Sequence, residues 1–288
     1  MIYKHAYLIT AHKSDETFDT LIRLLDDPMN DIFVHMDKKN KAFSENTMHT
    51  QFSKLVFVER TNVTWGGYSQ INAEVLLLKC AVKGNYKYYH LLSGEDLPIK
   101  TQKEIHRFFD SNDSKIFVDF QSKEFHWFER VKYYHLFQEF LGRKNYVLPN
   151  RIFIKMQKIL HVNRNKDIIF AKGANWFSIP HDFAQYIIDH EKTIKKVFKY
   201  TSNGDEVFLQ TLLINSSYID RLYYKKFDDN PVSIMREIDW KRGKPYIYRI
   251  DDLSMLIQSD RMFARKFDCK VDDLIIKSIK DHLQRSNI

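Results

Sequence analysis

The sequence predicts an α/β protein in which helices cover a mainly parallel central sheet, folded as a single domain. Strand and helix patterns alternate through the first hundred residues, which is the order of a sheet built from β-α-β units. Several of these strands are apolar on both faces, as strands buried between two helical layers are. Hydrophobic residues make up 44% of the 288, enough for a substantial core, and no repeat or low-complexity linker divides the chain.

In the first half, four strands are expected, at residues 6–12, 31–37, 54–59 and 86–92. A helix is predicted over 14–27, with Ser14 as its N-cap and an apolar face toward the sheet. A second helix is predicted over 69–84, where Gly84 provides the C-terminal stop.

The second half is less regular. Residues 123–144 are aromatic and basic and are predicted to be helical, and a strand followed by a helix is expected on either side of Pro180. A helix over 201–216 is predicted to start with two capping-box pairs, Ser202 with Asp205 and Asn203 with Glu206. An amphipathic helix, 271–284, ends the fold.

The formal net charge of +8 points to an anionic partner, such as nucleotide phosphates, a nucleic acid or an acidic membrane face. A solvated basic surface is the alternative. No RNA-binding signature is present and the basic residues are spread along the chain, so a nucleic-acid partner is not expected. The two cysteines, Cys80 and Cys269, fit a reducing compartment. No secretory segment or membrane span is visible, which predicts a cytoplasmic protein, with peripheral contact at the inner membrane face left open.

The usual nucleotide and hydrolase motifs are missing. The sequence has no G-x-G-x-x-G after the first strand, no Walker A, no G-x-S-x-G and no H-E-x-x-H. What remains is a nucleotide-type half-sheet with scattered basic residues and with acids that follow strands or start helices. This pattern suits a nucleotide-sugar transferase.

Blocks along nearly the whole chain carry a family resemblance. They are AYLITAHKSDETFDTLIRLL, DIFVHMDKK, TWGGYSQINAEVLLLK, YYHLLSGEDLPIKT, KGANWFSIP, NGDEVFLQTLL, REIDW, YIYRIDDL and FARKFD. In this order they resemble the core-2/I-branching N-acetylglucosaminyltransferase family, which includes peptide xylosyltransferases. The resemblance implies a glycosyltransferase-A fold, a nucleoside-diphosphate sugar donor, inversion at the anomeric carbon and catalysis without a divalent metal. Animal members are Golgi membrane proteins with several disulfides, so we expect a bacterial cytosolic relative.

The resemblance places the catalytic base at Glu206. In an inverting transferase, a carboxylate removes the proton of the acceptor hydroxyl as that hydroxyl attacks the anomeric carbon. A capping role for Glu206 is the alternative, and the two are compatible because a cap fixes a side chain at a helix start. Asp205 is the next candidate, as a cap or a supporting acid.

Arg249 and Lys266 match the residues that the family uses at the donor phosphates. The departing diphosphate gains negative charge, which fixed cations can stabilise. Arg supplies bidentate contacts and Lys a compact charge. The alternative is a surface pair in a chain with 45 Lys and Arg, and a surface role is expected for the neighbouring Arg265.

His12 and Asp37 end the first two strands, where a nucleoside docks in open α/β sheets. Both lie in blocks where the family places nucleoside contacts, and Trp65 matches an aromatic residue at the family's donor site. The alternatives are an ordinary loop histidine, a surface ion pair of Asp37 with the lysines that follow it, and core packing of Trp65.

The acids Glu95 and Asp96 follow the fourth strand, at a place where other transferases bind a metal ion. Because the resemblance puts cations at the phosphates, we predict that these acids accept hydrogen bonds from sugar hydroxyls or fix the loop; Asp96 could lock the turn before Pro98. Trp240 is the predicted acceptor-side aromatic residue, with core packing as its alternative. A helix face with Arg130 is a further acceptor candidate.

The predicted function is inverting, metal-independent transfer of a sugar from UDP-sugar to a glycan hydroxyl, the glycan being free or lipid-linked. The resemblance points to N-acetylglucosamine; UDP-xylose or UDP-glucose as donor, or a non-catalytic relative that binds nucleotide or carbohydrate, are the alternatives. Residues 1–110 are expected to form the nucleotide-binding half and residues 111–288 the acceptor-binding and catalytic half. No cofactor is expected.

Overall fold

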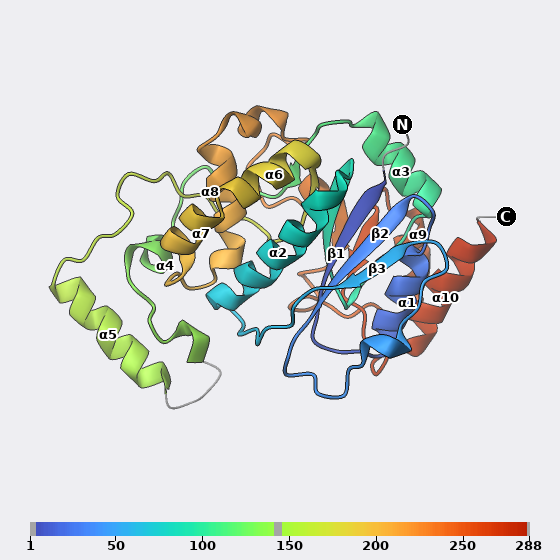
Figure 1. Ribbon diagram of the computed structural model, residues 1–288, viewed down its shortest axis with the longest axis horizontal. Helices are drawn as coiled ribbons and strands as arrows, with labels where there is room; N and C mark the ends of the chain where they lie inside the picture. The colour runs from blue at the N-terminus through green and yellow to red at the C-terminus, as the bar shows by residue number, and fades with distance from the viewer. Residues whose placement is uncertain (1–3, 141–145, 287–288) are drawn as a thin grey trace.

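A six-stranded sheet forms the centre of the computed structural model, which describes residues 4–140 and 146–286 (Figure 1). Its strand order is β3-β2-β1-β4-β7-β6. The first four strands in this order run parallel, while β7 is antiparallel to both β4 and β6. The bounds are β1 His5–Ala11, β2 Asn30–Met36, β3 Lys54–Phe57, β4 Tyr88–Ser93, β6 Phe117–Val118 and β7 Phe177–Pro180. The predicted α/β class with a mainly parallel sheet is confirmed.

The parallel register brings three strand ends to one edge of the sheet. Ala11 at the end of β1 pairs with Met36 at the end of β2, and Thr10 pairs with Ser93 at the end of β4. The chain winds from β1 to β2 and β3 in one direction, whereas β4 lies on the other side of β1. Ligands of open α/β sheets bind at such a reversal of strand order.

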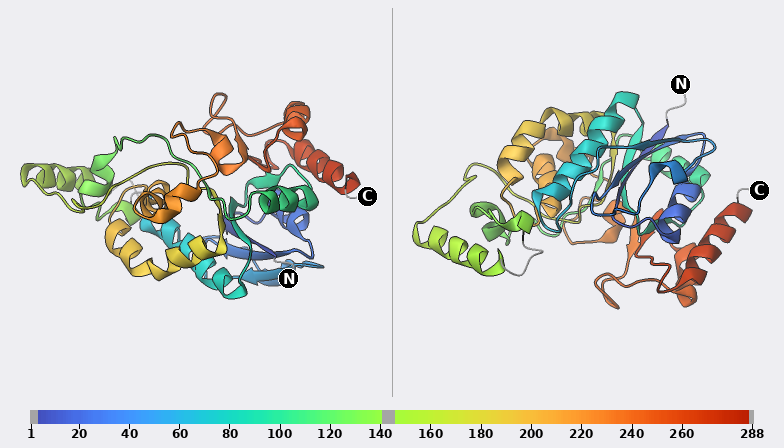
Figure 2. Two further views of the ribbon diagram at one scale, coloured as in Figure 1. Left: turned by 90° about the horizontal axis from the view of Figure 1, so that it is seen from above. Right: turned by 60° about the horizontal axis from the view of Figure 1, so that its bottom comes forward.

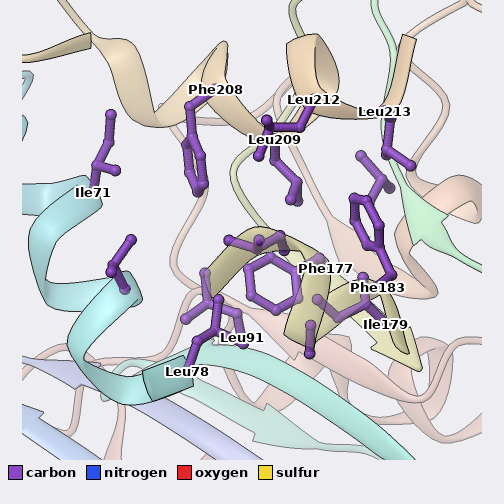
Figure 3. Packing of buried hydrophobic residues seen from close by; sticks show 14 of the residues in the cluster. Ile71, Leu78, Leu91, Phe177, Ile179, Phe183, Phe208, Leu209, Leu212 and Leu213 are labelled. Carbon is purple, nitrogen blue, oxygen red and sulfur yellow. The ribbon is translucent and has the colours of Figure 1, made fainter. Parts of the chain in front are cut away.

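Two hydrophobic cores lie on opposite faces of the sheet because successive strand residues point to opposite sides. In β1, Ala6 and Leu8 belong to the core under α2 Tyr68–Ala81 and α6 His181–Asp189. Tyr7 and Ile9 belong to the core under α1 and α10. Figure 3 shows part of the first core, where Leu78 of α2 and Leu91 of β4 lie near the Phe177 ring.

The remaining helices complete the layers and extend the molecule at one end. Figures 1 and 2 show α5 as an arm at the end opposite α10. The bounds are α1 Glu16–Leu25, α3 Gln102–Ser111, α4 Phe128–Lys132, α5 Val147–Ile159, α7 Glu191–Phe198, α8 Phe208–Ile214, α9 Leu253–Gln258 and α10 Asp273–Arg285.

A second, three-stranded sheet lies at the carboxyl edge of the first. Its order is β5-β9-β8, with β5 antiparallel and β8 parallel to β9. The strands are β5 Asp96–Pro98, β8 Arg236–Ile238 and β9 Phe263–Arg265. Because β5 follows β4 after two residues, this sheet starts at the strand end where the donor site is predicted.

Several local predictions were wrong in detail. The N-cap of α1 is Asp15, whose side chain accepts from the Phe18 amide at 3.3 Å, and not Ser14. The turn after α2 places its left-handed residue at Asn85 (φ 51°), not at Gly84. Within 123–140, the helical part is confined to α4 and a short 3₁₀ turn, and the predicted end of that helix, 141–144, lies outside the described residues.

Neither predicted capping box exists at residues 202–206. Asn203 adopts a left-handed conformation (φ 49°), and its amide donates to the Gly66 carbonyl at 2.8 Å. The following 3₁₀ turn, Gly204–Glu206, leads into α8. A long-range backbone bond therefore replaces the local caps, and Asp205 and Glu206 are free for other partners.

His5 and His90 of the sheet are buried, and the half-buried His106 of α3 lies against His5. The His90 ring contacts His5 (Nε2 to Nδ1, 3.0 Å) and Ser178 (Nδ1 to Oγ, 2.8 Å), and His106 contacts Asn30 (Nε2 to Oδ1, 2.8 Å). Burial lowers the pKa of all three histidines. The rings are therefore neutral in the folded protein at neutral pH.

We predict that acid weakens the fold through these rings. Below pH about 6.5 the histidines of the unfolded chain bind protons, whereas these rings stay neutral in the folded protein. The free energy of unfolding therefore falls as pH falls, by up to about 1.4 kcal/mol per histidine per pH unit. In urea unfolding at pH 7.5 and 5.5, His90→Gln should lose less stability between the two values than the wild type does. An unchanged pH dependence in the variant would contradict this.

Candidate functional site

A hollow of about 570 Å³ opens beside the ends of β1 and β2. His12 and Asp37 both line it, so the structure brings these two predicted residues together. The Asp37 amide donates to the Ala11 carbonyl at 2.7 Å, which joins the two strand ends. His12 is exposed, whereas Asp37 is buried and accepts from the Lys39 amide at 2.9 Å. Their binding of a nucleoside stays a prediction.

Glu95 links two lysines, one of which, Lys13, lines this hollow. One of its oxygens accepts from Lys13 Nζ at 2.9 Å, and the other lies 2.8 Å from Lys266 Nζ. Lys13 also donates to Asp268 at 2.9 Å. Burial opposes ionisation of Glu95, but the hydrogen bonds from Lys266 and Lys13 outweigh it and hold the pKa of Glu95 below its ordinary value.

Sequence reasoning missed Lys13, although it directly follows His12 at a strand end. The sequence also predicted that Glu95 accepts hydrogen bonds from sugar hydroxyls or fixes the loop. In the structure both Glu95 oxygens are engaged by ammonium groups, so the geometry favours a role in positioning the two lysines.

Asp96 is fully buried and its hydrogen bonds are within the fold. It accepts from the Ser93 amide at 2.9 Å, the Ser93 hydroxyl at 2.7 Å and the Arg265 guanidinium at 2.7 Å. The Arg265 guanidinium in turn lies 4.4 Å from the centre of the Trp176 ring. This geometry matches the alternative in which Asp96 fixes the loop, and it gives Arg265 a partly buried structural place instead of the expected surface role.

Arg249 and Lys266 lie on neighbouring segments. The amide of Tyr248 donates to the Lys266 carbonyl at 2.9 Å, which brings Arg249, the next residue, close to Lys266 just after β9. The Arg249 side chain is exposed, and Lys266 keeps about a quarter of its side-chain surface exposed, at 26%. Both side chains predicted for the phosphates are therefore at least partly accessible to solvent.

Glu206 lies in a second cluster, between two cations. Its Oε2 accepts from Arg130 Nη1 at 2.8 Å and lies 3.3 Å from Lys172 Nζ. Both cations also lie over the Trp127 ring, at 4.9 and 5.4 Å from its centre. Among residues 4–140 and 146–286, no hydrogen bond forms to Oε1, and the side chain is 34% exposed. One carboxylate oxygen is anchored and the other faces solvent.

Arg130 reaches Glu206 from α4. The helix predicted over 123–144 does not continue past α4, because the backbone is extended at Tyr133. Sequence reasoning missed Lys172 and Trp127, although Lys172 opens the quoted KGANWFSIP block. A lysine followed directly by glycine at the start of that block was the signal that could have pointed to it.

The backbone behind Glu206 depends on a glycine. The Gly173 amide donates to the Glu206 carbonyl at 3.0 Å. A Cβ at residue 173 would lie only 1.9 Å from the carbonyl oxygen of Asp119, far inside contact distance. Only glycine permits three chain segments to meet this closely behind the carboxylate.

The segment 172–176 joins the two clusters. Lys172, at its start, contacts Glu206, and Trp176, at its end, stacks on Arg265 beside Asp96. Four residue steps span at most about 14 Å between the two Cα atoms. This short segment therefore connects the cluster around Glu206 to the Arg265–Asp96 ion pair.

Two of the predicted site residues present exposed indole rings. Trp65 is 78% exposed and Trp240 is 60% exposed, so core packing, the alternative considered for both, is wrong. Each ring is available to stack on a sugar or a base.

Asp205 and Glu74 form a buried acid pair behind Glu206. Asp205 accepts from Gln70 Nε2 at 3.2 Å, and its other oxygen has no partner within the described residues. Burial, together with the neighbouring charge of Glu206, raises the pKa of Asp205 to about 7. Burial raises the pKa of Glu74 as well. Asp205 cannot reach a substrate, and its environment marks a functional region.

One further group of metal-type ligands lies beside Lys13. Asp15, Asp268 and Cys269 bring their ligand atoms within 4.8 Å of one another. A cation there would compete with the Lys13 ammonium group, which already neutralises Asp268. We therefore assign no metal site to this group.

Comparisons with known proteins agree with this geometry. A family model described as Core-2/I-Branching enzyme matches residues 5–255. A human N-acetyllactosaminide beta-1,6-N-acetylglucosaminyl-transferase is 26% identical over 297 residues, covering 96% of this chain and 71% of the relative. A human beta-1,3-galactosyl-O-glycosyl-glycoprotein beta-1,6-N-acetylglucosaminyltransferase is 25% identical over 309 residues, covering 97% and 69%. Mouse xyloside xylosyltransferase 1 shares 8% identity at a TM-score of 0.34, covering 93% of this chain and 98% of its own, and we draw nothing from so low a likeness.

We predict that Asp205→Asn stabilises the protein at alkaline pH. The unfolded carboxyl ionises near pH 4 and the folded one near pH 7, so the wild type loses stability as pH rises between these values. A shift of this size corresponds to roughly 4 kcal/mol at most above pH 7. The change in Tm caused by Asp205→Asn should therefore be more positive at pH 8 than at pH 4, by several degrees, in thermal unfolding. Equal effects at both pH values would contradict the assignment.

Proposed function

Because the chain belongs to the Core-2/I-branching enzyme family and is a glycosyltransferase, we propose that it transfers N-acetylglucosamine from its UDP form to a glycan hydroxyl, with inversion and without a divalent metal. The observation that carries this proposal is Glu206, a carboxylate with one oxygen anchored by two cations and one oxygen open to solvent. The names of the relatives support the choice of sugar. The same site with UDP-xylose or UDP-glucose is the alternative.

Glu206 is the base in this proposal. Its open Oε1 takes the proton of the acceptor hydroxyl while the hydroxyl oxygen forms a bond to the anomeric carbon. The bond from that carbon to the donor phosphate breaks, and its electron pair leaves with UDP. Attack opposite the leaving group inverts the anomeric carbon. Arg130 and Lys172 hold the carboxylate in place, which favours a near-attack geometry.

Lys266, Arg249 and Lys13 stabilise the departing diphosphate. An ammonium group has three donors, so Lys13 and Lys266 can bind Glu95 and still donate to phosphate oxygens. Glu95 supports this role because it fixes both ammonium groups before the donor arrives, and fixed charge is effective where negative charge develops. The lysines occupy the place where a metal-dependent enzyme would hold its cation.

The nucleoside half of the donor binds at the ends of β1 and β2, where His12 and Asp37 line the hollow. Trp65 lies on the donor side and Trp240 on the acceptor side, each with an exposed ring for stacking. A non-catalytic relative would need the cavity and the aromatic residues, but it would have no use for the anchored Glu206 carboxylate.

Glu206→Gln should reduce turnover by about 10²–10⁴-fold, because glutamine keeps the shape but accepts no proton. The dissociation constant for UDP should stay close to that of the wild type. Asp113→Asn, which removes an exposed carboxylate beside Lys87 at the amino end of β4, is the control and should keep full activity. Rates with a panel of UDP-sugars also identify the donor. Wild-type turnover in a folded Glu206→Gln enzyme would remove Glu206 from the mechanism.

Transfer should continue at close to the full rate in excess EDTA, because Lys266 and its neighbours supply the positive charge. Lys266→Ala should weaken UDP binding and slow transfer together. Lys277→Ala, which removes an exposed ammonium group of α10, should do neither. Glu95→Gln should weaken UDP binding without creating a metal requirement. The measurement is the initial rate with chelator and after manganese addition; loss of activity with EDTA and recovery with manganese would make Glu95 and Asp96 metal ligands instead.

A further inference from the structure

The helix α5 has the opposite polarity to an ordinary surface helix. Its buried residues are polar: Asn150 and Gln157. The Gln157 amide group accepts from the Tyr134 amide at 2.8 Å and donates to the Tyr134 carbonyl at 2.9 Å. These hydrogen bonds attach the helix to the body of the protein together with the Phe153 ring, whose centre lies 6.3 Å from that of Phe137.

The outward face of α5 carries an apolar stripe. Its side chains are spaced by three or four residues, so they lie on one side of the helix. Each is between 52% and 70% exposed. The stripe consists of Leu148, Ile152, Met156, Ile159 and, directly after the helix, Leu160. Contiguous apolar surface of this kind marks a binding site.

The charge beside the stripe is entirely positive. Arg151 and Lys155 are exposed one position before Ile152 and Met156, and no Asp or Glu occurs between Tyr146 and Lys166. Lys158 is paired with Glu129, and it therefore contributes less free charge. A basic border around an apolar stripe complements a surface that has both acyl chains and negative headgroups.

We propose that α5 docks the protein onto an anionic lipid bilayer, lying in the plane of the interface with its stripe turned into the acyl boundary. Thirteen residues give a helix of about 20 Å, shorter than a hydrocarbon core of about 30 Å. Among residues 4–140 and 146–286, no helix combines the length and the hydropathy needed to cross a membrane. The helix is therefore suited to rest on a bilayer and not to span it.

The charge pattern disfavours a second copy as the occupant. In a two-fold dimer the same surface patch meets itself, so the stripes of two copies would bring Arg151 and Lys155 close to the same cations of the partner. No acidic residue lies in the flanking sequence to compensate them. The place of α5 at one end of the molecule leaves room for a flat surface (Figures 1 and 2).

The docking helix is connected to the cluster around Glu206. Tyr134, which binds Gln157, and Glu129, which binds Lys158, lie in the same segment as Arg130, the partner of Glu206. Membrane docking itself does not depend on the proposed function, and its test needs no turnover.

Flotation of the full chain with vesicles tests the proposal. The protein should bind vesicles of equimolar phosphatidylcholine and phosphatidylglycerol, and bind vesicles of phosphatidylcholine alone at least tenfold more weakly. Ile152→Glu/Met156→Glu should lose at least tenfold in affinity. Leu274→Glu/Met255→Glu, which makes the same change at exposed apolar residues of α10 and α9, is the control and should bind like the wild type.

The charge contribution is tested separately. Arg151→Gln/Lys155→Gln should weaken binding to the anionic vesicles by about fivefold per residue and flatten its salt dependence. Lys195→Gln/Lys196→Gln removes the same charge at two exposed positions of α7 and should have little effect on vesicle binding. All of these side chains are exposed, so unchanged thermal unfolding is expected and is measured alongside.

Three outcomes would overturn the proposal. The first is failure of the folded wild type to bind anionic vesicles, and the second is equal binding by the Ile152→Glu/Met156→Glu variant. The third is dimerisation in sedimentation equilibrium that the same variant abolishes, without lipid binding, which would make a second copy the occupant of the stripe.

Discussion

Two adjacent carboxylates, Glu95 and Asp96, hold the second sheet against the carboxyl edge of the first, and the site depends on this junction. Asp96 in β5 pairs across the sheet with Arg265 in β9, and their side chains form an ion pair at 2.7 Å. Taking an ion pair out of water is costly unless hydrogen bonds satisfy both groups. Asp96 accepts three such bonds, and Glu95 adds a backbone bond from Phe267 at 2.9 Å. These bonds anchor Arg265 and Phe267, so Lys266, which lies between them in the chain, is positioned with them.

Ion pairs with a carboxylate also organise the cluster around Glu206. Arg130 and Lys172 come from segments far apart in the chain, and both meet the same carboxylate oxygen. Among residues 4–140 and 146–286, no cation forms an ion pair with Asp205 or Glu74, the acids behind it, and burial raises the pKa of both. Such uncompensated burial costs stability and is typical of functional regions, where geometry is maintained at the expense of stability.

Helix α5 shows why amphipathicity alone does not say which face of a helix is buried. The stripe from Leu148 to Ile159 has helical spacing, and by pattern it would be assigned to a core. In the structure Gln157 is turned inward because its amide group matches the free backbone donor and acceptor of Tyr134. Hydrogen bonds to a distant segment therefore decide the orientation of this helix.

The sequence by itself determined the parallel sheet of the first hundred residues, with strand bounds accurate to a few positions. These strands are apolar over several residues, and β2 pairs with β1 and β3, its neighbours in the chain, so local pattern and tertiary contact agree there. Family motifs also singled out Glu206 and Lys266. Only the tertiary structure decided the second sheet, because β5, β8 and β9 have three residues each, too few for a periodic signal, and β9 meets β5 from more than 160 residues away. It also decided the partners of the site residues. At Asn203 a bond to Gly66 replaced a capping box, and Lys13 and Lys172 gained their roles from carboxylates that the chain brings to them only on folding.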